Sequence, residues 1–131
     1  MGTWGLTSFE NDDALDWVID LESTPDMSLI IDTLFLVNES EDDYLDASDS
    51  CFALAAAEVV AALAGKPATD LPDEVVKWVE EKGKPSDELV WNAIQAIRAV
   101  LGDSELKELW EETDEFEMWV TDVEGLLERL G

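Results

Sequence analysis

Carboxylates are the abundant reactive side chains of this sequence. The chain has 33 Asp and Glu among 131 residues, no histidine and a single cysteine. Without histidine, neither a Ser-His-Asp triad nor a Cys-His pair can form, and no imidazole can bind a metal. Cys51 stands beside Phe52 and Ala53 with no base nearby, which predicts an inert buried thiol. Any catalysis would therefore depend on the carboxylates.

A carboxylate enzyme would be a hydrolase with two acids, one with a raised pKa, as in glycosidases. No spacing singles out such a pair, so a hydrolase is the least favoured function. Calcium suits oxygen-rich segments better because it takes roughly six to eight oxygen ligands. The acidic segment 39–46 lacks the glycine and the spacing of an EF-hand. We expect weak, non-specific cation binding, with no defined metal site and no cofactor.

Two features are candidates for contact with a partner. The first is a predicted solvated acidic loop around Tyr44, whose acids are Glu39, Glu41, Asp42, Asp43 and Asp46. The second is Trp91, which is offset from the apolar face of its predicted helix. Exposed tryptophans are typical of interfaces because they combine a large apolar surface with a polar N–H. The other tryptophans lie mostly on apolar helical faces, which predicts core packing.

Glu58 interrupts the longest nearly apolar run, residues 51–64. If it is buried it needs a partner, because an isolated buried carboxylate is strongly destabilising or becomes protonated. Arg98, the indole N–H of Trp4 and backbone amides of the N-terminal arm are the candidate partners. We hypothesise that Glu58 anchors this arm. The alternative is that Glu58 points to water from a face of small alanine side chains.

The charge distribution limits the partners. The first 65 residues contain fifteen acids and no Lys or Arg, and the whole chain has a formal net charge of −26. So anionic a molecule repels DNA, RNA and anionic lipid, and attracts cations and basic proteins. We expect no nucleic-acid partner and no membrane partner. The sequence gives no indication of the oligomeric state.

The totals indicate one folded domain. Of all residues 47% are hydrophobic and six are tryptophan, unlike a disordered acidic tail. One cysteine cannot form an internal disulfide, and the N-terminus lacks a basic region followed by an apolar stretch. The apolar run 51–64 is shorter than the roughly 20 residues that span a membrane. We therefore expect a cytoplasmic protein with a buried helix at this run.

Helical periodicity runs through the whole chain, and no strand-like alternation persists. The predicted helices begin near Asn11, Thr24, Ser48, Pro72, Ser86 and Asp103, and a further segment from Phe116 continues or follows the last one. Thr113 and Asp114 favour a break between these two, and Gly65 is the predicted C′ residue. The sequence predicts an all-α fold: a single compact helical domain, residues 1–131, of about six or seven helices with an irregular aromatic N-terminal arm.

The second predicted helix has an apolar face. Its spacing puts five side chains on that face: Met27, Ile30, Ile31, Leu34 and Phe35.

The N-terminal motif resembles a known family. Residues 1–5 read Met-Gly-Thr-Trp-Gly, and residues 9–14 read Phe-Glu-Asn-Asp-Asp-Ala. This opening resembles that of the small bacterial family catalogued as domain of unknown function 4259. Residues 55–63 and 106–112 are also similar, so the resemblance covers nearly the whole chain. It implies a shared fold and no activity.

The arm departs from that family at residues 6–8, where members often carry Gly and Pro, so the arm is expected to turn differently here. The candidate structural anchors combine the arm with the helices; they are Trp4, Phe9, Asn11, Glu58 and Arg98.

Two functions of different classes remain beside the hydrolase. The favoured one is a small acidic cytoplasmic binding or inhibitory protein, immunity-like, that docks a basic protein partner. The other is an acid-rich housekeeping or structural protein of a bacterium or archaeon with a salt-rich cytoplasm, whose lysine-poor surface stays hydrated. Acids gathered on one face would favour docking, and acids spread over all faces would favour salt adaptation.

Overall fold

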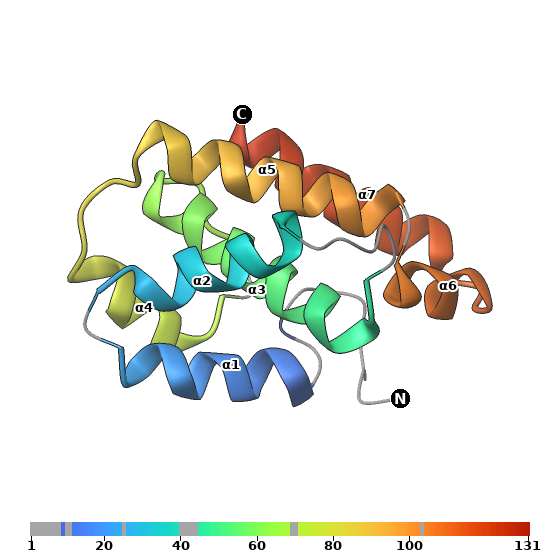
Figure 1. Cartoon of the computed structure of the whole chain (residues 1–131), viewed down its shortest axis with the longest axis horizontal. Helices are drawn as coiled ribbons and strands as arrows, with labels where there is room; N and C mark the ends of the chain where they lie inside the picture. The colour runs from blue at the N-terminus through green and yellow to red at the C-terminus, as the bar shows by residue number, and fades with distance from the viewer. Residues whose placement is uncertain (1–8, 10–11, 25, 40–44, 69–70, 103) are drawn as a thin grey trace.

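A computed structural model of the chain describes residues 9, 12–24, 26–39, 45–68, 71–102 and 104–131. Seven helices follow one another in this part of the chain (Figure 1): α1 (Asp12–Glu22), α2 (Ser28–Asn38), α3 (Ala47–Leu63), α4 (Asp73–Glu80), α5 (Asp87–Gly102), α6 (Glu105–Glu111) and α7 (Phe116–Leu130). The all-α prediction is confirmed, and the last two segments are separate helices. The β-type pairing in these residues is limited to an isolated bridge between Leu45 and Ser104.

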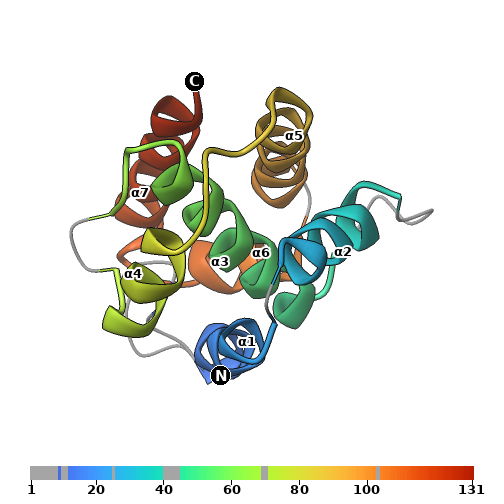
Figure 2. The same ribbon diagram turned by 90° about the vertical axis from the view of Figure 1, so that its left-hand side faces the viewer.

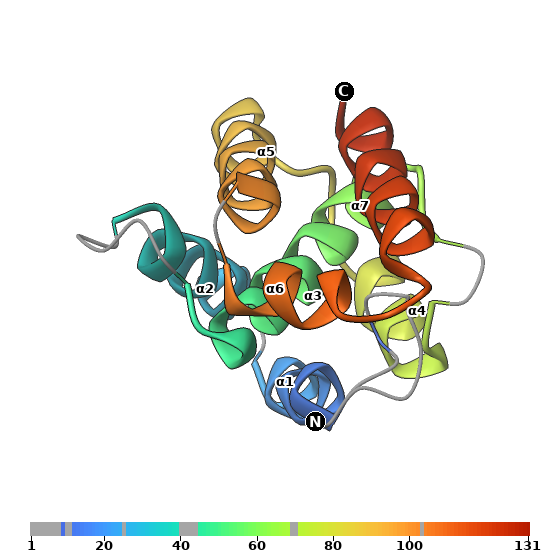
Figure 3. The same ribbon diagram turned by 90° about the vertical axis from the view of Figure 1, so that its right-hand side faces the viewer.

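The central element is α3, which contacts each of the other six helices of the described chain. Two views at right angles to the first show the other helices arranged around it (Figures 2 and 3). Every residue from Ala53 to Leu63 is buried. The alanines of this helix let neighbouring helices approach closely on all sides, because helix separation depends on the side chains at the contact. The predicted buried helix at residues 51–64 is confirmed.

Both ends of α3 follow the expected capping chemistry. The Asp46 carboxylate accepts a hydrogen bond from the backbone N–H of Asp49, at 2.7 Å. At the other end Gly65 has φ +91°, and the backbone N–H of Lys66 donates to the Ala61 carbonyl at 2.9 Å. This is the Schellman arrangement, which favours glycine because the left-handed conformation brings no Cβ clash. The prediction for Gly65 is confirmed.

The predicted start of the second helix is wrong. The Thr24 hydroxyl donates to the Asp20 carbonyl at 2.8 Å, so Thr24 lies in the turn that closes α1, two residues after its last residue. The Asp26 carboxylate accepts from the backbone N–H of Ser28 at 3.0 Å, and α2 begins at Ser28. A threonine before a proline signals a helix start only when the chain does not use that threonine to close the preceding helix. Pro25 lies outside the described residues.

The N-cap of α6 is Ser104. Its hydroxyl accepts from the backbone N–H of Lys107 at 3.1 Å and donates to the Val100 carbonyl at 2.8 Å. Ser104 can do both because a hydroxyl is donor and acceptor at once. Asp103, the predicted cap, lies outside the described residues, as does Asn11. The structure therefore assigns the cap of α6 one residue later than the sequence suggested.

Four tryptophans are buried: Trp17, Trp78, Trp110 and Trp119. The indole N–H of Trp17 donates to the Thr33 hydroxyl at 2.9 Å, which joins α1 to α2. The indole N–H of Trp78 donates to the Thr24 carbonyl at 2.9 Å, which joins α4 to the end of α1. The rings of Trp110 and Trp119 stack with their centroids 6.5 Å apart. Core packing is thus confirmed for these four.

None of the described helices is both long and apolar enough to cross a membrane.

Candidate interaction surface

The outer side of α2 exposes large apolar side chains. Ile30 and Leu34 are buried, whereas Ile31, Phe35 and Leu36 are exposed. The spacing in the sequence puts Ile30, Ile31, Leu34 and Phe35 on one helical face, and the structure buries only Ile30 and Leu34 of these four. α2 contacts α3 and α5, and these neighbours cover the side of α2 that carries Ile30 and Leu34. Because α2 is apolar on nearly every side, its periodicity alone did not identify the covered one.

A pocket of about 320 Å³ opens beside Ile31, between the start of α2 and the start of α5. Met27, the N-cap of α2, and Ile31 line it from the α2 side, and Pro85 and Leu89 line it from the α5 side. The two helices lie side by side in the front layer of the molecule, with α2 below α5 (Figure 1). The pocket therefore continues the exposed apolar side of α2 towards α5.

A hydrogen bond holds the end of α2 to the second turn of α5. The Asn38 amide nitrogen donates to the backbone carbonyl of Asn92, at 3.0 Å. Asn38 is the last residue of α2, and Asn92 lies in the second turn of α5. The bond holds the end of α2 against α5, so the surface between the helices keeps a defined shape.

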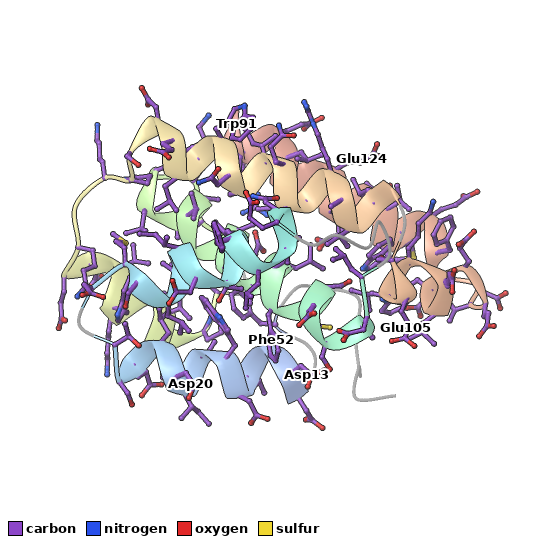
Figure 4. The ribbon with its side chains drawn as sticks, viewed as in Figure 1. Asp13, Asp20, Phe52, Trp91, Glu105 and Glu124 are labelled. Atoms are coloured by element: carbon purple, nitrogen blue, oxygen red, sulfur yellow. The ribbon has the colours of Figure 1, made fainter. Side chains whose placement is uncertain are left out.

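The exposed side of α2 also carries charge. Asp32 is exposed between Ile31 and Leu36 on the helix surface. We call these residues, Ile31, Asp32, Phe35 and Leu36, the α2 face. α1, α2 and α3 contain no Lys or Arg. Asp20 points outward from α1, the helix below α2 (Figure 4). Lys84, at the rim of the pocket, is accompanied there by Glu88.

The predicted partner-facing residues are dispersed. Trp91 is exposed on the outer side of α5 and does not line the pocket (Figure 4). Glu39 is exposed directly after α2, and Asp46 is exposed while it caps α3. The other loop acids, Glu41, Asp42 and Asp43, lie outside the described residues. Of the partner-facing residues predicted from the sequence, Glu39 therefore lies next to the α2 face. The apolar residues of that face were not among the predicted ones.

Glu58 is buried, with 3% of its side chain exposed, so the alternative in which it points to water is wrong. Its carboxylate accepts a hydrogen bond from the Arg129 guanidinium at 2.7 Å. Arg129 also donates to the Lys66 carbonyl at 3.3 Å. Arg98, the partner suggested by the sequence, is exposed on α5. The salt bridge to Glu58 comes from α7, which no local sequence signal indicated.

The N-terminal anchors are described only in part. Phe9 is buried and belongs to the hydrophobic core. Trp4 and Asn11 lie outside the described residues. The anchoring of the N-terminal arm by Glu58 therefore stays a prediction. In the described residues, the salt bridge of Glu58 with Arg129 links α3 to α7.

Cys51 is buried near the start of α3. Burial raises the pKa of its thiol to about 12, and the carboxylates of Asp13 and Asp46 add to the effect. A neutral thiol is a poor nucleophile, as the sequence predicted. In the part of the chain that the structure describes, no three His, Cys, Asp or Glu side chains are arranged to hold a metal ion.

The fold and this surface define an all-helical acidic domain with an exposed apolar helix. The model of a family described as Domain of unknown function (DUF4259) matches residues 2–122, and the chain belongs to this family. The resemblance seen in the N-terminal motif is thereby confirmed. No curated protein and no solved structure matches the chain.

Proposed function

We propose that this is a small acidic cytoplasmic protein, binding or inhibitory in an immunity-like manner, that docks a basic protein partner. The observation that supports it best is where the exposed apolar side chains lie. The described residues expose eight large apolar side chains, and five of them are on α1 and α2: Leu15, Ile19, Ile31, Phe35 and Leu36. Exposed apolar residues that share one side of a helix, as Ile31, Phe35 and Leu36 do on α2, are typical of protein interfaces.

The charge of the same helices favours a basic partner. α1 and α2 lie within the first 65 residues, which contain no Lys or Arg. A basic protein that approaches this side meets acids and no cationic group of these helices. Complementary fields of this kind raise association rates and disfavour anionic competitors.

The test is capture of basic proteins by the full chain, compared between two variants with the same change of net charge. One variant neutralises the α2 side by Asp32→Asn, Glu39→Gln and Glu88→Gln. The matched control neutralises α7 by Glu117→Gln, Glu124→Gln and Glu128→Gln. All six side chains are exposed. We expect salt-sensitive capture of a defined basic protein that the α2-side variant loses and the α7 variant keeps. Equal loss in both variants would point to diffuse charge attraction and contradict docking.

A second candidate is supported by the spread of the acids. All seven described helices expose carboxylates, for example Asp16, Asp32, Asp49, Glu74, Glu88, Glu111 and Glu124. Such an even distribution favours an acid-rich housekeeping or structural protein of a salt-rich cytoplasm. Charge spread in this way acts on solubility and stability at low salt, without a specific partner. The salt dependence of stability, treated in the Discussion, tests this candidate.

A further inference from the structure

We propose that the basic partner docks on the α2 face as an amphipathic helix that carries Lys or Arg beside its apolar stripe. This inference rests on the proposed function and adds the docking site and the form of the partner. In this arrangement the apolar stripe contacts Ile31, Phe35 and Leu36, and a cationic side chain pairs with Asp32.

The first argument is the composition of α2. Of its eleven residues seven are Leu, Ile, Phe or Val, and a helix that is apolar all round is normally buried. Here only one side is covered by α3 and α5, and Phe35 remains 60% exposed. Single exposed apolar residues are common, but three on one helix side form a patch. Such a patch is typical of a surface that a partner covers.

The second argument is the shape. Ile31 and Phe35 stand one turn apart on α2, so they form a ridge along the helix. The pocket lined by Met27, Pro85 and Leu89 lies beside the start of this ridge. A ridge of apolar residues next to a pocket between two helices suits the helix-in-groove mode, in which residues at i, i+3, i+4 and i+7 insert. α2 spans about 16 Å, which matches roughly three turns of a partner helix.

The third argument identifies the charge of the partner. Asp32 lies within the α2 face, so a partner that covers Ile31 and Leu36 also takes water from this carboxylate. An unpaired carboxylate that loses its water is strongly destabilising. The partner must therefore bring a cation to Asp32, which a neutral apolar helix would not do.

The same reasoning disfavours a second copy of the chain. In a two-fold symmetric dimer, the same surface of each copy would face the other. Each copy carries a formal net charge of −26, and the helices that would meet contain no Lys or Arg. An anionic membrane is disfavoured for the same reason. A basic helix is not repelled by the negative charge of the chain, as a second copy or an anionic membrane would be.

The experiment measures binding of three labelled peptides of about 18 residues to the full chain by fluorescence anisotropy, at low and high salt. The first peptide is a designed helix of Leu, Ala and Lys with its apolar residues at i, i+3, i+4 and i+7. The second has the same composition in scrambled order, and the third has Gln in place of every Lys. We expect the amphipathic lysine peptide to bind at least about tenfold more tightly than either control.

Two pairs of variants locate the site. Phe35→Ser is matched by Met118→Ser on α7, since these side chains are 60% and 59% exposed. Asp32→Lys is matched by Glu124→Lys, also exposed on α7. We expect Phe35→Ser and Asp32→Lys to remove the tenfold preference and the two α7 variants to keep it. Because all four side chains are exposed, the thermal melts should stay close to that of wild type.

Each contrary outcome identifies what is wrong. If the lysine peptides bind in a salt-sensitive way but Phe35→Ser has no effect, the α2 face is not the site, although docking of basic partners stands. If no lysine peptide binds, both proposals are wrong. If the Gln peptide binds as well as the Lys peptide, the partner is apolar rather than basic. A dimer that Phe35→Ser disperses in sedimentation would assign the face to a second copy and overturn the proposal.

Discussion

At the scale of single residues, Glu58 shows what a highly charged chain requires in its core. Among the described residues it is the only buried acid. Its carboxylate lies 2.7 Å from the Arg129 guanidinium, which is itself 26% exposed. A charge-assisted hydrogen bond of this kind compensates the carboxylate for the water it has lost. The chain has seven bases, and one of them serves this internal purpose.

Arg129→Met should destabilise the protein by about 2–4 kcal/mol, because it leaves the Glu58 carboxylate without its guanidinium. The low end reflects the partial exposure of Arg129, since water screens part of the interaction. Urea unfolding followed by circular dichroism measures the change. Arg98→Met is the matched control, because Arg98 is the other arginine and is exposed. It should change the free energy of unfolding by less than about 0.5 kcal/mol.

Glu58→Gln separates the charge from the shape of the side chain. If it melts like the wild-type protein, the hypothesis that the Glu58 charge anchors the N-terminal arm is wrong.

The raised pKa of Cys51 predicts slow thiol chemistry. At about pH 8 the native thiol should react with an aromatic disulfide reagent only as fast as the chain opens, because the neutral buried group is no nucleophile. In urea the same sample should release one equivalent at once, which is the internal control because the chain has a single cysteine. Fast reaction of the folded protein would contradict the burial of Cys51.

The raised pKa of Cys51 also makes the free energy of unfolding depend on pH at alkaline pH. The pKa of the thiol is raised to about 12 in the folded protein, above its ordinary value of 9.0. The neutral thiol therefore contributes its full stability below about pH 9, and this contribution is lost as the pH rises towards about 12. Cys51→Ala should remove that part of the alkaline destabilisation.

At the scale of elements, α2 has a buried side and an exposed side, and each side carries a leucine that can be substituted for comparison. Leu34 is 1% exposed and Leu36 is 70% exposed, two positions apart on one helix. Leu34→Ala should cost about 2–5 kcal/mol, because it removes buried methyl groups and leaves a cavity. Leu36→Ala should change stability by less than about 0.5 kcal/mol. Urea unfolding of both variants measures the difference, and helix propensity cancels because both substitutions are the same.

A cost of several kcal/mol for Leu36→Ala would mean that the outer side of α2 is covered in the isolated chain. Such a result would contradict the exposure on which the docking proposal depends.

At the scale of the whole molecule, the net charge of −26 should make stability depend on salt. Carboxylates on every described helix repel one another, and the screening length falls from about 10 Å at 0.1 M salt to about 3 Å at 1 M. We expect Tm to rise by roughly 5–10 °C between about 0.05 and 1 M KCl. Sucrose is the control, since it strengthens burial without screening charge.

The variant Asp16→Asn with Asp20→Asn tests the origin of that rise. It should melt higher than wild type at low salt and equally at 1 M, because screening already removes the repulsion there. A Tm that does not depend on salt would contradict self-repulsion and remove the support for salt adaptation as the second candidate function.

Much of the fold followed from local chemistry in the sequence. The alanine-rich run predicted the buried α3, and Gly65 marked its end. Ser86 was expected to cap a helix, and its hydroxyl accepts from the backbone N–H of Leu89 at 3.1 Å. The family followed from the N-terminal motif. These features depend on neighbours along the chain, within about one helical turn, so a sequence can specify them.

The tertiary structure decided what depends on residues far apart. Arg129 rather than Arg98 pairs with Glu58, across 71 positions of sequence, because only packing of α7 against α3 brings them together. Thr24 closes α1 instead of opening α2, because its hydroxyl has a carbonyl within reach. The exposure of the α2 face could not be predicted from the sequence for a related reason. On a helix that is apolar nearly all round, periodicity cannot say which side the neighbours cover, and only the positions of α3 and α5 leave Ile31 and Phe35 in solvent.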